Sequence, residues 1–229
     1  MRVAPVWDDA GVSTRTSILI CAALIVVATL VGLALYPQLP DPMPSHWDAA
    51  GNVDGYMSRI WGVLLLPLMT AGLAVLLFAI PSLDPLRANI ERFRAQYNAF
   101  VVGFVAFMVY TYALTLAAGM GRQFNMARML LPAMGLPFIG VGRLLRTARR
   151  NYFIGIRTQW TLASEEVWQA THVLGARTFT VGGIVVIAAG FLGEAEFWLG
   201  MAVLIGAALV PVVYSYVLWR RLGRPGPTP

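Results

Sequence analysis

The stretch "TSILICAALIVVATLVGLALY", residues 16–36, is 21 residues long and carries no charged residue. An α-helix needs about 20 consecutive apolar residues to cross the hydrocarbon layer of a bilayer. The run follows Arg15 and leads into "PQLP" without a small-residue cleavage site. We therefore interpret it as a retained membrane helix and not as a removed signal peptide.

Similar apolar runs continue along the chain, and we predict six membrane-spanning helices. They cover residues 16–36, 60–80, 97–120, 128–145, 178–193 and 197–219. Pro132, Gly135, Pro137 and Gly140 make the fourth run the weakest, and we expect it to be weakened or kinked. Hydrophobic residues make up 58% of the chain and charged residues 12%, which is typical of a membrane protein. The predicted fold class is an all-α polytopic membrane protein.

The arginines predict how the chain lies in the membrane, because every basic residue is an arginine. One set of loops and termini contains Arg2, Arg15, Arg87, Arg92, Arg94, Arg143, Arg146, Arg149, Arg150, Arg157, Arg177, Arg220, Arg221 and Arg224. The other set contains only Arg59, Arg122 and Arg128. Arginine-rich loops stay in the cytoplasm. We expect both termini to lie in the cytoplasm and no direct binding of nucleic acid.

A small polar island, "LPDPMPSHWDAAGNVDGYMSR" at residues 39–59, separates the first two spans. "SHWD" and "GYMSR" flank a turn-rich segment, which predicts an extracellular hairpin. We expect Gly51 and Gly55 to give the turn its backbone freedom and Asp54 to cap it. Trp47 and Tyr56 are predicted at the headgroup level. The island is either a loop cap anchored by its aromatic rings or a binding surface for an external ligand.

The loop at residues 146–178, between the fourth and fifth spans, predicts a cytoplasmic amphipathic helix. Ser164 is a good N-cap, and the helix is expected to end at Gly175 and to lie in the membrane interface. Its predicted faces are Val167, Trp168, Thr171 and Leu174 on one side and Glu165, Gln169 and His172 on the other. The polar face is either solvated or a docking surface for a soluble partner.

The residues do not favour an enzyme. Cys21 is the only cysteine, and the candidate metal ligands His46, Asp48 and Asp54 are predicted on the opposite side of the bilayer from His172. The sequence contains no HExxH, GxSxG, Walker or dinucleotide-binding motif. We expect no catalytic activity, no metal and no cofactor. A membrane transporter or exporter of a peptide or lipid-like ligand is an alternative, although the span centres carry no ionisable residue of the kind that couples ions.

Two segments resemble known family patterns. "YPQLPDPMPSHWDAAGNVDGYMSR" resembles the domain pattern called DUF1648, and "NYFIGIRTQWTLASEEVWQATHVLG" is similar to the signature of the SdpI family of bacterial membrane immunity proteins. Gln159 departs from the proline usual in that signature. The resemblance implies a DUF1648-like region at 1–96, with the outer loop at 37–59, and an SdpI-like region at 97–229.

The resemblance also implies a bacterial inner-membrane protein with a function on each side of the membrane. The outer loop would sense a secreted peptide toxin, and the inner loop would signal by recruiting a cytosolic ArsR-type repressor. The family pattern points to Pro44, His46, Gly51, Asp54 and Gly55 outside, and to Asn151, Gly155, Arg157, Thr158, Trp160, Trp168 and His172 inside. To these we add Trp47, Tyr56 and Glu165.

Physical chemistry leaves several of these roles open. His46 would hydrogen-bond either the hairpin itself or a peptide. Gly155 would allow a sharp bend in the chain. The guanidinium of Arg157 suits helix C-terminal carbonyls or a partner carboxylate. Trp160 and Trp168 are either membrane-interface anchors or contacts for a partner.

Overall fold

The structure is a computed structural model, and it describes residues 12–190 and 196–226 of the chain. Within those residues, six helices are long and apolar enough to cross a membrane. They are α1 (Thr14–Leu35), α2 (Arg59–Leu83), α4 (Arg94–Gly119), α5 (Met126–Thr147), α7 (Glu165–Ala189) and α8 (Glu196–Arg221). The predicted all-α polytopic class is confirmed. Arg2 and the predicted end of the fifth span, residues 191–193, lie outside the described residues.

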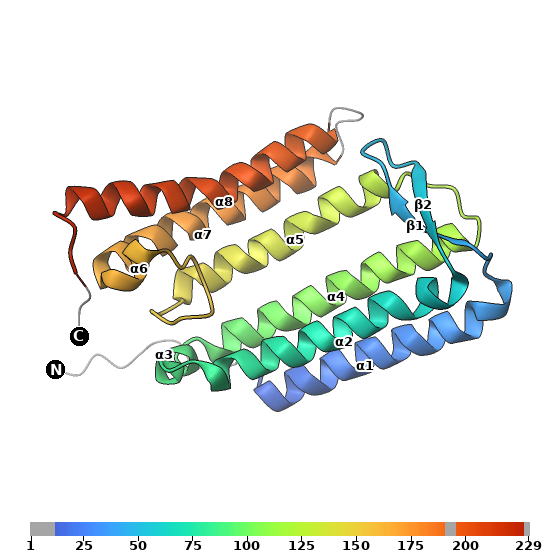
Figure 1. The fold of residues 1–229 in the computed structure, drawn as a ribbon, viewed down its shortest axis with the longest axis horizontal. Helices are drawn as coiled ribbons and strands as arrows, with labels where there is room; N and C mark the ends of the chain where they lie inside the picture. Colours follow the sequence, from blue (N-terminus) through green and yellow to red (C-terminus); the bar gives the residue numbers. More distant parts are fainter. Residues whose placement is uncertain (1–11, 191–195, 227–229) are drawn as a thin grey trace.

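Shorter elements connect these helices. A 3₁₀ turn, η1 (Tyr36–Gln38), follows α1 and leads into an antiparallel hairpin of β1 (Met43–Trp47) and β2 (Val53–Met57). The short helices α3 (Arg87–Glu91) and α6 (Gln159–Ala163) lie at the opposite end of the molecule (Figure 1). The sequence predicted the hairpin but neither α3 nor α6.

The long helices form two groups of three. Helices α1, α2 and α4 contact one another, and α5 packs on α7, which packs on α8. Figure 1 shows the first group in blue to green and the second in yellow to red, with α4 and α5 adjacent between them. The α4–α5 contact is therefore the main junction between the groups.

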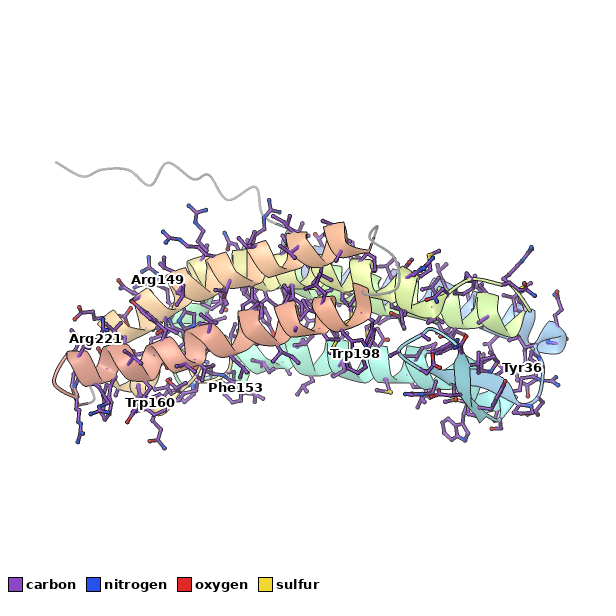
Figure 2. The ribbon with its side chains drawn as sticks, turned by 90° about the horizontal axis from the view of Figure 1, so that it is seen from above. Tyr36, Arg149, Phe153, Trp160, Trp198 and Arg221 are labelled. Atoms are coloured by element: carbon purple, nitrogen blue, oxygen red, sulfur yellow. The ribbon has the colours of Figure 1, made fainter. Side chains whose placement is uncertain are left out.

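The two ends of the molecule differ in chemistry. Tyr36 and the hairpin lie at one end, which we call the hairpin end, and Arg149 and Arg221 lie at the other, the arginine-rich end (Figure 2). Each end has its own buried apolar cluster, formed around Met43 and Tyr112 at the hairpin end and around Tyr97 and Trp168 at the other. Both polar loops are thus fixed to a packed core.

The fourth predicted span is one unbroken helix, α5, with Pro132 and Pro137 inside it. Its glycines bring it close to α7. A Cβ atom on Gly135 or Gly183 would collide with the backbone carbonyl of the other residue. Small residues at helix contacts allow this close approach in membranes. Neighbouring helices also commonly satisfy the backbone carbonyls that prolines within a span leave without a hydrogen bond.

The predicted separate interfacial helix at residues 164–175 is wrong in its extent. Ser164 caps the helix as expected, but α7 continues through Gly175 to Ala189. Gly175 lies inside the helix and does not end it. The absence of a side chain at Gly175 makes room for the side chains of Ile156 and Leu145. Trp168 and His172, predicted on opposite faces, are both buried. The face of α7 that carries Trp168 and His172 is covered by protein, while Gln169 on another face is exposed.

Candidate functional site

The hairpin turn is capped by Asp48. Its carboxylate accepts the backbone N–H of Asn52 at 2.8 Å and the side-chain amide of Asn52 at 3.2 Å. These hydrogen bonds hold the pKa of the Asp48 carboxyl below its ordinary value. Gly51 has φ +84°, a conformation that other residues rarely adopt. The turn role predicted for Gly51 is confirmed, whereas the capping role predicted for Asp54 belongs to Asp48.

Asp54 instead pairs with His46 across the two strands. Nδ1 of His46 and Oδ1 of Asp54 are 2.5 Å apart, and both side chains are largely exposed. Gly55 lies opposite His46 in strand β2 and not in the turn, which corrects its predicted position. A Cβ atom on Gly55 would be 2.8 Å from that of His46, so the glycine lets the strands approach.

Buried contacts hold the hairpin on the helices. The Met43 side chain is fully buried and lies against Gly62 of α2 and Gly119 of α4. Asn125 caps α5 by accepting the N–H of Arg128 at 2.9 Å, and its amide donates to the carbonyl of Ala50 at 2.6 Å. One side chain therefore ties the hairpin turn to the start of α5.

A cavity of about 400 Å³ lies between the hairpin and the helices, and we call it the hairpin cavity. Strand β1 and the start of the turn form one wall, and helices from both groups form the others. The lining includes Pro44, Ser45, His46, Trp47, Asp48, Trp61, Leu65, Leu66, Thr111, Leu130, Met134, Phe197 and Met201. Its volume is in the range of small-molecule or side-chain binding sites, and its walls are mainly apolar with a few polar groups at the hairpin.

The cavity separates the predicted sensing residues into two sets. Pro44, His46 and Trp47 line it. Gly51, Asp54, Gly55 and Tyr56 do not, and the Tyr56 side chain is 61% exposed. The first three can contact a ligand in the cavity, whereas the glycines and Asp54 shape the hairpin.

Asn151 organises the loop at the arginine-rich end. Its side chain is buried; its oxygen accepts the backbone N–H groups of Phe153 and Ile154, and its amide donates to the carbonyls of Arg149 and Ile154. Asp84 of the α2 C-terminus accepts the N–H of Tyr152 at 2.8 Å. The loop is thus fixed to the first helix group although it belongs to the second in sequence.

His172 and Trp168 support the same loop from beneath. The imidazole stacks on the indole with ring centroids 3.9 Å apart, and Nε2 accepts the N–H of Ile156 at 3.1 Å. Nδ1 is 2.8 Å from the Trp168 carbonyl, an arrangement that fits a neutral ring with hydrogen on Nδ1. Trp168 is fully buried and donates to the Ala148 carbonyl. It is a core residue, not an interface anchor.

Gly155 makes the bend that was predicted for it. Its φ is +112°, and a Cβ atom there would collide with Nε2 of His172. The loop can therefore pass over the imidazole only because residue 155 has no side chain.

The remaining predicted residues lie at or near the surface of this end. Arg157 is exposed and donates to the Tyr152 carbonyl at 3.0 Å, a loop carbonyl rather than a helix C-terminus. Thr158 caps α6 and contacts Ser215 at 3.2 Å. Trp160 packs on Tyr216 of α8, and Glu165 lies 3.9 Å from Arg150. Figure 2 shows Trp160 and Phe153 at this end.

The predicted residues therefore form two sites at opposite ends of the molecule. In the described ranges, no group of three or more His, Cys, Asp or Glu side chains could hold a metal ion. The sequence analysis missed Met43, Asp84 and Asn125, which fix the two loops to the helices. Asp84 and Asn125 adjoin helix termini, where short polar side chains commonly bond to backbone groups, and that position was the available signal.

Six apolar helices with a folded loop at each end define a multi-pass membrane protein. Residues 147–215 match the SdpI/YfhL protein family, and residues 23–71 match a domain of unknown function, DUF1648. The chain is also similar to Immunity protein SdpI from Bacillus subtilis (strain 168), with 23% identity over 206 residues, covering 89% of this chain and 96% of that protein. The chain therefore contains one region similar to the SdpI family and one similar to DUF1648, and it is similar to an immunity protein over most of its length. No solved structure matches it.

Proposed function

We propose that this protein is a membrane immunity protein that protects its cell against a secreted peptide toxin. The observation that carries the proposal is the similarity to Immunity protein SdpI, which extends over 89% of the chain and includes both polar loops. The hairpin cavity supports the proposal, since it is mainly apolar and has polar groups at its hairpin wall, as a site for a peptide would need.

The orientation follows from the arginines. The arginine-rich end would face the cytoplasm of a bacterial cell, with both termini inside. The hairpin end would then face outward, where a secreted peptide arrives. Apolar side chains of the peptide would contact Trp61 and Leu65 in the hairpin cavity, and polar groups would meet His46 and Asp48.

The loop at the arginine-rich end would report to a soluble protein. Tyr152 and Phe153 are 52% and 39% exposed, although Asn151 beside them is fully buried. Exposed aromatic rings on a fixed backbone, next to the exposed Arg157, are the features of a protein-binding surface. We propose an ArsR-type repressor as the partner, as the family resemblance implies.

Survival of a sensitive bacterial host tests the immunity function. Cells with and without the protein are challenged with an SDP-type secreted peptide toxin over a concentration series. Immunity predicts that the protein raises the toxin concentration needed to kill half of the cells. Unchanged killing, with the protein shown to be inserted in the membrane, would contradict the proposal. Gradient-driven flux of labelled peptide into vesicles would indicate an exporter instead.

A substitution at each end tests the division of roles. Arg157→Ala should keep protection and abolish recruitment of the repressor to the membrane, because Arg157 lies far from the hairpin cavity. His46→Ala should reduce protection. If both variants lost protection while remaining folded and inserted, the division into an outer sensor and an inner reporter would be wrong.

A further inference from the structure

We propose that a groove between α4 and α5 binds one anionic phospholipid from the leaflet at the arginine-rich end. The groove has a volume of about 820 Å³ and does not share a lining residue with the hairpin cavity. Phe100 and Phe104 form part of its wall, and Gly103 opens it between them, since a Cβ atom on Gly103 would meet no atom within 4 Å. This wall is apolar and suits a hydrocarbon chain.

The groove is long enough to hold an acyl chain with its headgroup at the entrance. It is lined from Gln96, near the start of α4, to Tyr110, and these residues are about 21 Å apart along a helix that rises 1.5 Å per residue. One leaflet contributes about 15 Å of the roughly 30 Å hydrocarbon layer. At the far end, the Tyr110 hydroxyl donates to the Met129 carbonyl at 3.2 Å and bridges α4 to α5. A chain entering from the arginine-rich end would stop there.

The polar groups of the groove gather at its entrance. Gln96 and Arg143 line it at the arginine-rich end, and both side chains are exposed. A guanidinium binds phosphate oxygens through two parallel hydrogen bonds. Basic pockets between membrane helices on this side of a protein are typical sites for anionic headgroups. The charge at the entrance therefore complements a phosphate and the apolar wall complements the attached chain.

The dimensions favour a lipid over a helix from a second copy. A volume of about 820 Å³ spread over about 21 Å gives a mean cross-section near 40 Å². A helix with side chains is at least about 10 Å across, which corresponds to roughly twice that area. A bound lipid would fill the junction between the two helix groups.

Lipid retention by the purified full-length protein tests this site. The protein in detergent is titrated with phosphatidylglycerol or with phosphatidylcholine of the same acyl chains, and bound lipids are counted by native mass spectrometry. We expect one retained phosphatidylglycerol per chain and weaker retention of phosphatidylcholine. Arg143→Gln should weaken phosphatidylglycerol binding about fivefold, the effect of losing about 1 kcal/mol per basic group.

Two matched pairs give the controls. Gly103→Leu fills the groove and should abolish retention, whereas Gly72→Leu, on α2 and also without an atom within 4 Å of its Cβ position, should not. Arg146→Gln removes an exposed arginine from the same end of α5 outside the groove and should bind like the unmodified protein. Equal retention of the two lipids, or retention by Gly103→Leu, would overturn the proposal. The proposal would also be overturned if the protein were a dimer, and if Gly103→Leu dissociated that dimer without changing the amount of bound lipid.

Discussion

At the scale of single residues, the same residue type has different roles according to the atoms around it. Asp48 and Asp54 are six positions apart in one hairpin, yet Asp48 caps the turn and Asp54 pairs with His46. A capping aspartate was predicted correctly, but the predicted residue, Asp54, was wrong. Which aspartate lies at the turn depends on the pairing register of the two strands, and that register is shifted by bulges. His172 was assigned to a polar face although the loop above it covers the ring.

The contact between Gly155 and His172 gives a prediction at this scale. Gly155→Ala should lower the free energy of unfolding by about 1 to 3 kcal/mol, the cost of a strained backbone and of a displaced imidazole. Unfolding of the purified protein in detergent, followed by circular dichroism, measures the change.

Gly121→Ala is the matched control for this substitution. Gly121 also has positive φ, at +75°, but a Cβ atom there meets no atom within 4 Å. It should therefore destabilise the protein less than Gly155→Ala. Equal losses would mean that the His172 ring moves aside at no cost.

At the scale of elements, apolar run length predicted the membrane helices well and their connections less well. Five spans match helices to within a few residues at each end, because an uninterrupted run of about 20 apolar residues has few other structures available in a membrane. The predicted start of the fifth span, residue 178, is wrong, because α7 begins at Glu165. The first part of α7 contains polar residues, and protein contacts bury some of them. Periodicity cannot distinguish a face turned to water from one covered by a loop.

The link between the hairpin and α5 gives a prediction for these elements. Asn125→Asp keeps the oxygen that caps α5 but removes the amide that donates to Ala50. Amide hydrogen exchange at residues 48–52 should become faster, while the first turn of α5 stays protected.

Asn125→Ala removes both contacts and should also destabilise the start of α5, by about 1 kcal/mol. If Asn125→Asp left the exchange of the hairpin amides unchanged, the buried Met43 side chain alone would hold the hairpin in place.

At the scale of the whole molecule, the two helix groups form one bundle, with the hairpin at one end and the second polar loop at the other. The family resemblance and the apolar runs predicted six membrane helices with a polar loop on each side, but not the division of the helices into two groups of three. The cavities were not predictable, since the hairpin cavity combines residues from β1, α2, α4, α5 and α8. Such a site forms where segments far apart in the sequence pack together. Local patterns in a single sequence do not show which segments will pack.

The orientation of the bundle can be tested directly. Cys21 is buried in α1, so cysteines introduced at the exposed positions Asn52 and Arg149 can be labelled selectively in a Cys21→Ser background. A membrane-impermeant maleimide should label Asn52→Cys in intact cells and Arg149→Cys only after permeabilisation, because arginine-rich loops stay inside. The reverse pattern would place the hairpin in the cytoplasm and remove the basis for toxin sensing.

Recognition of the toxin in the hairpin cavity, which we propose, is tested by a cavity-filling substitution. Leu65 lines the cavity, whereas Leu68, one turn further along α2, is 58% exposed on the outside of the bundle. The measurement is the toxin concentration that kills half of the host cells expressing Leu65→Trp or Leu68→Trp at equal membrane levels. We expect Leu65→Trp to lose most of the protection, because the indole fills the cavity, and Leu68→Trp to retain it. Full protection by Leu65→Trp would contradict recognition in the cavity.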